Sequence, residues 1–165
     1  MAESAAGESS QGISKSGDLA YDAFYGAAVG GAVLAFFFLA VDIIAGRALY
    51  TPSMLGQVLF EGADPASVEG VRLEMVAYFT AVHLVSFLVL GGVISFLCQA
   101  LGIAKSMVPV VTGVVFVILT AAFFAGDLLL MQGVAQAIGI PLVLAANFVT
   151  ALAMAIFFRQ AHTAD

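Results

Sequence analysis

The stretch MVAYFTAVHLVSFLVLGGVISFL, residues Met75 to Leu97, decides the fold. It holds one histidine and a few hydroxyl groups, but no Lys, Arg, Asp or Glu. A helix of about 20 apolar residues crosses the roughly 30 Å hydrocarbon layer of a bilayer. The apolar residues show no period-two alternation, which a barrel strand would require. We therefore expect this stretch to be a membrane-spanning helix.

Three further stretches have the same character. They run over Ala23 to Ala45, Val108 to Leu130 and Ile138 to Phe158. The connections near residues 99–107 and 131–137 are short, so successive helices should be antiparallel neighbours. The sequence thus predicts an all-α fold, an integral membrane antiparallel four-helix bundle over residues 21–160, with a C-terminal tail at 161–165.

The composition agrees with a chain dissolved in lipid. Of its 165 residues, 62% are hydrophobic and 10% charged, and the mean hydropathy is +1.11, whereas soluble domains are near half apolar and a quarter charged. A net charge of -6 leaves no basic surface for nucleic acid. The single cysteine, Cys98, cannot form an internal disulfide, which excludes thiol oxidoreductases that need paired cysteines. The bilayer is the expected partner, and nucleic acid is not.

The segments before and after the first stretch are polar. Residues 1–20, rich in Ser, Gly, Ala and acidic side chains, are predicted to be a disordered tail. Glu3 and Glu8 do not fit the basic start of a secretory leader, so the first helix should remain in the mature chain. In the following loop we expect a short interfacial helix over residues 52–60, with Thr51 as its cap and Gly62 at its end.

Positive charge indicates the orientation. Arg47 and Arg72 lie on the side of the long acidic loop, and the opposite side carries Lys15, Lys105 and Arg159. Because cytoplasmic segments carry the excess of Lys and Arg, both termini are expected in the cytoplasm.

Small residues mark the faces through which the helices should pack. Helices in lipid choose partners by close approach of small side chains. The predicted packing residues recur at helical spacing, and they are Gly26, Ala27, Gly30, Gly31, Ala35, Gly91, Gly113 and Ala151.

The few polar residues of the spans fall on the same faces. Counting 1.5 Å per residue from one membrane side predicts an inner layer of His83, Thr120 and Asn147. Asp42 and Asp127 should form a shallower carboxylate pair, with Arg47 near enough to neutralise one of them.

These polar residues have both a structural and a functional interpretation. His83 could hydrogen-bond Asn147 or a backbone carbonyl, or it could handle protons or bind haem or a metal ion. Asp42 and Asp127 could pair with Arg47, or they could form an entrance for cations. A metal site of His83, Asp42 and Asp127 would combine residues at different depths, so we predict no metal ion and no cofactor.

The chain resembles a group of uncharacterised bacterial membrane proteins of four spans. The resemblance covers most of the chain, and it includes the run Thr51 to Gly56. The other residues that carry it are Tyr78, His83, Phe87, Gly91, Asn147, Met154, Arg159 and His162. It implies a multi-pass protein of the bacterial inner membrane, and it supplies no catalytic role.

The sequence contains no nucleophile elbow, zinc-protease, Walker or dinucleotide-binding motif. We therefore expect a non-enzymatic structural or accessory subunit of a membrane complex, which binds a protein partner or further copies of itself. A proton or small-cation transporter using Asp42, Asp127 and His83 is the first alternative. A redox subunit that holds haem or contacts quinone is the second.

Overall fold

The computed structural model describes residues 2–101 and 107–161, and within them the regular structure is helical. The elements are α1 (Ala2–Ile44), α2 (Tyr50–Glu61), the 3-10 turn η1 (Pro65–Ser67), α3 (Leu73–Ala100), α4 (Val108–Leu129), α5 (Val134–Ile138) and α6 (Ile140–Ala161). Four segments are long and apolar enough to cross a membrane: Ala23–Ile44, Leu73–Leu97, Val108–Leu129 and Ile140–Gln160. The prediction of an all-α membrane bundle with four spans is confirmed, and the chain is a multi-pass membrane protein.

Exposed aromatic side chains accompany the two ends of the spans. Tyr21, Phe24 and Tyr25 are exposed around the start of the first span. At the other end of the bundle Phe60 of α2 packs edge-on against Tyr78 of α3, with ring centroids 5.6 Å apart. Tyrosine is enriched where a bilayer meets water, so these groups indicate the two membrane surfaces.

The four spanning helices pack in the order α3, α1, α6, α4. Helix α1 contacts both α3 and α6, and α6 also contacts α4, whereas α3 and α4 touch only slightly. Buried side chains from all four helices form one core, which includes Phe87, Val111, Val115 and Met154. The expected contact between successive spans therefore holds for the first and last pairs but is weak for the middle pair.

Glycines let α1 approach both of its neighbours. A Cβ atom on Gly91 would lie 2.4 Å from the carbonyl oxygen of Ala23, and one on Gly30 would lie 2.5 Å from the sulfur of Met154. Gly26, Ala27, Gly31 and Ala151 are also buried. The structure places these six predicted packing residues between helices.

The other two predicted packing residues lie on the outside. Gly113 and Ala35 are exposed, and a Cβ atom on Gly113 would meet nothing within 4 Å. Thr112, Val115 and Leu119, which are buried, define the inner face of α4, and Gly113 points away from it. Helical spacing groups residues on one face, but it does not say whether that face meets protein or lipid.

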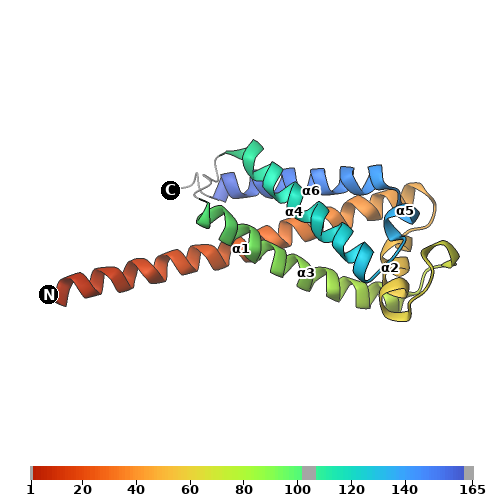
Figure 1. Cartoon of the computed structure of the whole chain (residues 1–165), viewed down its shortest axis with the longest axis horizontal. Coiled ribbons are helices and arrows are strands. Elements are labelled where there is room, and N and C mark those ends of the chain that lie inside the picture. The colour runs from red at the N-terminus through yellow and green to blue at the C-terminus, as the bar shows by residue number, and fades with distance from the viewer. Residues whose placement is uncertain (1, 102–106, 162–165) are drawn as a thin grey trace.

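The N-terminal segment differs from the predicted disordered tail. Helix α1 begins at Ala2, and its first part projects from the bundle as a continuation of the first span (Figure 1). Starting a helix is the unfavourable step, whereas extending an existing one adds a hydrogen bond for each residue ordered. The span therefore acts as a nucleus for a segment with little apolar surface of its own. The structure does not describe the side chains of Lys15 and Cys98. The residues Lys105 and His162 also lie outside the described part of the chain.

One end of the bundle is closed by a cap, which we define as α2, η1 and α5 (Figure 1). Met54, Leu55 and Val58 of α2 form a second core with Val68 and Val134. The predicted interfacial helix is present but longer than expected, and it is largely buried against protein. Gly62 ends it with a φ of 67°, as expected.

Candidate functional site

Asp42 is a buried carboxylate in the last turn of α1, with 1% of its surface exposed. The backbone N–H of Thr51 donates to its Oδ2 at 2.7 Å, and the Thr51 hydroxyl donates to its Oδ1, also at 2.7 Å. Thr51 is the second residue of α2, where an N–H group has no partner within the helix and a negative charge is favourable. Asp42 therefore holds the start of α2.

The two hydrogen bonds from Thr51 to Asp42 take the place of the predicted Thr51 cap of α2. Thr51 lies inside the helix, and Leu49 occupies the N-cap position with a φ of 66° and no side-chain hydrogen bond. A leucine in the left-handed region is unfavourable and persists where the surroundings impose it. Asp42, which holds the next turn from outside, is one such constraint.

Asp127 plays the corresponding part for α5. It lies in the last turn of α4, and the backbone N–H of Ala135 donates to its Oδ1 at 3.0 Å. Ala135 is the second residue of α5, after Gly133 at the N-cap. Each carboxylate thus fastens a short helix to the end of a span.

Arg47 does not neutralise either carboxylate, so that prediction is wrong. Its guanidinium lies over the ring of Tyr50, 4.0 Å from the centroid. Among the described residues the ion pairs are those of Arg72 with Glu61, at 2.7 Å, and with Glu74. The hydrogen bonds that the Arg72 guanidinium donates to Glu74 and then to Glu61 raise the pKa of Arg72 above its ordinary value.

Arg72 also ties the start of α3 to the cap through its backbone. Its N–H donates to Ser53 Oγ at 2.8 Å, and the Gln57 amide donates to the same oxygen at 3.2 Å. Sequence reasoning missed this group. Ser53 and Gln57 stand four residues apart among apolar positions of α2, and that spacing was the available signal.

His83 joins α3 to α1. Its Nε2 lies 3.0 Å from the carbonyl oxygen of Gly31. Its ring lies between Phe79 and Phe87, with centroid distances of 6.1 Å and 4.7 Å. Of the two structural partners considered from the sequence, the structure shows the backbone carbonyl and not Asn147.

Asn147 joins α6 to α4. It is 4% exposed, and its amide donates to Thr120 Oγ1 at 3.3 Å. The predicted layer of His83, Thr120 and Asn147 is therefore divided between two helix pairs. The sequence count started from Met75 and Ile138, whereas α3 begins at Leu73 and α6 at Ile140.

The same design occurs in both halves of the chain. In α1–α2–α3 and again in α4–α5–α6, an aspartate holds a short helix, and one polar bond joins the two spans. The halves meet mainly through α1 and α6. Within the described residues no three His, Cys, Asp or Glu side chains come together as a metal site.

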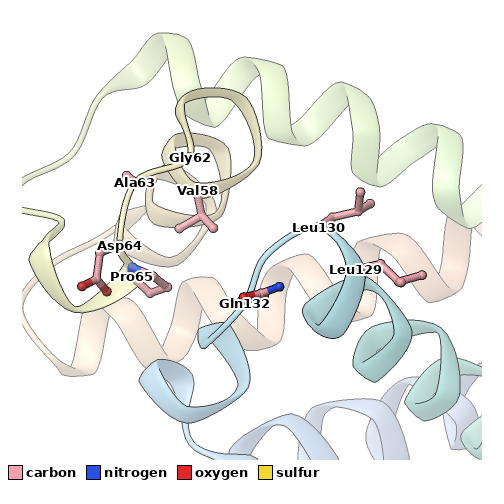
Figure 2. A pocket seen from close by; sticks show the side chains of 8 residues that line it. All are labelled: Val58, Gly62, Ala63, Asp64, Pro65, Leu129, Leu130 and Gln132. Atoms are coloured by element: carbon pink, nitrogen blue, oxygen red, sulfur yellow. The ribbon is translucent and has the colours of Figure 1, made fainter.

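The two other polar features are a pocket and a set of hydroxyls. Figure 2 shows an open pocket of about 340 Å³ beside the cap, lined by Val58, Gly62, Ala63, Asp64, Pro65, Leu129, Leu130 and Gln132. The Asp64 carboxylate already accepts the N–H of Ala66 at 2.9 Å. Within the part of the chain that the structure describes, the buried hydroxyls without a hydrogen-bond partner are those of Ser95, Thr112 and Thr150.

Comparison with known proteins adds no assignment. Neither the protein-family models, nor the curated proteins, nor the solved structures contain a match to this chain.

Proposed function

We propose that this protein is a non-enzymatic accessory or structural subunit of a complex in a bacterial inner membrane. One observation carries the proposal. Asp42, Asp127, His83 and Asn147, the side chains that could have served chemistry, all make hydrogen bonds that hold the chain's own helices. A small bundle whose polar groups serve its own rigidity suits a scaffold.

The alternatives receive less support from the same geometry. A cation entrance needs two carboxylates that face an open route, but Asp42 is buried under Thr51 and Asp127 holds α5. A haem ligand needs a free imidazole nitrogen directed at iron, and because Nε2 of His83 is already engaged by Gly31, only Nδ1 is left to serve as one. The accessory role therefore remains the preferred proposal.

The orientation and the family also belong to this proposal. The cap lies at one end of the bundle, and the projecting part of α1 and the end of α6 lie at the other (Figure 1). With the termini in the cytoplasm, the cap faces the periplasm. The resemblance to bacterial four-span membrane proteins, carried by the run Thr51 to Gly56 and by His83, supports this placement.

The test is gentle extraction from the native membrane, followed by native mass spectrometry of the particle. A protein companion in constant ratio, or a defined number of copies, is expected. Recovery of an isolated monomer under every mild extraction would contradict the proposal.

A matched pair of variants locates the contact. Gly113→Leu adds bulk to the exposed face of α4, where nothing lies within 4 Å. Ala145→Leu adds it to an exposed position on α6. Both variants should keep the helical circular dichroism signal. Loss of the companion in one variant alone places the interface on that helix.

A further inference from the structure

Of the two ring nitrogens of His83, Nε2 has a defined hydrogen-bonding role and Nδ1 does not. The oxygen of Gly31, 3.0 Å from Nε2, is a carbonyl oxygen and can only accept a hydrogen bond. Nε2 must therefore carry a hydrogen, in the neutral ring as well as in the charged one. In the neutral ring the lone pair then lies on Nδ1. Among the described residues, Nδ1 has no hydrogen-bond partner.

Burial among apolar side chains opposes a positive charge on the ring, and the bond to the Gly31 oxygen favours it. The ring of Phe87 has its centroid 4.7 Å from that of the imidazole, within the limit of about 6 Å for cation–π attraction, whereas the ring of Phe79 lies just beyond that limit at 6.1 Å. The bond to the Gly31 oxygen becomes charge-assisted when the ring is protonated, and such bonds are about twice as strong as neutral ones. The Gly31 oxygen and the Phe87 ring can therefore stabilise an imidazolium without any rearrangement, against the cost of burial.

Among the described residues, no charged side chain is bonded to His83. At 1.5 Å per residue, Asp22 and Asp42 on α1 stand about 14 Å and 16 Å along the helix from Gly31, and Glu74 on α3 stands about 14 Å from His83. On α2, which also packs against α3, Glu61 is paired with Arg72. The other charged groups of the spans, Asp127 on α4 and Arg159 on α6, stand on helices that do not pack closely on α3. The carbonyl and the two rings therefore constitute the site.

We propose that Nδ1 of His83 is a proton-binding site within the membrane. It takes one proton from water, and the ring charge rises from zero to plus one. Nε2 keeps its own hydrogen and its bond to Gly31, so the contact between α1 and α3 is the same with and without the proton. This role goes beyond that of an accessory subunit and does not depend on it.

The chain has two histidines, which makes a direct test possible. With His162→Gln and ¹⁵N-labelled histidine in lipid nanodiscs, the imidazole signals come from His83 alone. At high pH we expect a protonated Nε2 and an unprotonated Nδ1. As the pH falls, the Nδ1 signal should move to the protonated position while Nε2 remains protonated. A hydrogen on Nδ1 at high pH would overturn the proposal. So would an Nδ1 signal that stays constant until the helical circular dichroism signal is lost.

Two variants separate the proton site from the helix contact. In His83→Gln the amide can still donate to Gly31 but offers no titrating nitrogen, and His83→Leu lacks both properties. Proton uptake on acidification should fall by one per chain in both variants relative to the parent, and only His83→Leu should have a lower melting temperature. Equal proton uptake by the parent and a folded His83→Gln would overturn the proposal. The labelling experiment uses the native His83 and therefore holds even where a variant fails to fold.

Discussion

At the scale of single residues, the two aspartates are the most informative groups. A carboxylate near a span end could serve as an anchor, a ligand or an entrance. The decisive fact is the partner: Thr51 donates twice to Asp42, and Ala135 donates once to Asp127. Both partners are the second residue of a short helix, so the two carboxylates do the same structural work.

Asp42→Ala should lower the free energy of unfolding by about 2 to 4 kcal/mol, because it leaves a buried N–H and a buried hydroxyl without their charged acceptor. Asp127→Ala should lower it less, since one bond at a half-buried site is lost. Reversible unfolding in mixed SDS and dodecylmaltoside micelles measures both. When Asp42→Ala is combined with Thr51→Val, the loss of unfolding free energy should be smaller than the sum of the two single losses, because both remove the same hydrogen bond. Simple additivity would contradict that bond.

Arg72 makes a different prediction because its ion pairs are exposed. Arg72→Gln should reduce stability slightly at low salt, and the effect should disappear in high salt, where exposed charges are screened. The raised pKa of Arg72 means that its contribution is fully present at neutral pH and is lost only as the pH rises through that raised value. Micelle unfolding at two salt concentrations checks the first part, and a loss that persists in high salt would contradict it.

At the scale of the elements, close approach decides which helices pair. Gly91 brings α3 against the backbone of α1, and in lipid such contact replaces the hydrophobic force that drives helices together in water. The cap helices follow a different rule. They bury apolar side chains against each other, as Met54 and Val134 show.

Gly91→Ala should lower the unfolding free energy by about 1 to 3 kcal/mol, because its Cβ atom would lie 2.4 Å from the Ala23 oxygen and the two backbones must separate. Gly113→Ala is the matched control on α4 and should leave stability unchanged, since its Cβ atom meets nothing within 4 Å. The same micelle assay compares them. Equal effects of the two substitutions would mean that α1 and α3 do not approach this closely.

At the scale of the whole molecule, the four spans place the cap and the projecting part of α1 on opposite sides of the membrane. In a Cys98→Ala background, Asp64→Cys and Gln132→Cys should react with an impermeant maleimide added from one side of oriented vesicles. Tyr21→Cys and Arg159→Cys should react only from the other side. Reaction of a cap position and Tyr21→Cys from the same side would rule out four crossings.

The sequence alone determines the number of spans, their helical form and the stop at Gly62. Lipid offers no partner to a backbone N–H or carbonyl, so a long apolar run has no alternative to a helix. Six of the eight small residues predicted to pack lie between helices for a related reason, since only small side chains permit close approach.

Only the tertiary structure decided which helices are neighbours and which side chains bond to one another. It separated His83 from Asn147, turned Gly113 and Ala35 outward, buried α2 and gave the aspartates their short helices. Each of these depends on the order α3, α1, α6, α4. That order is not written in the hydropathy pattern, because every face of a helix in lipid is apolar and the choice of neighbour rests on shape and on a few hydrogen bonds.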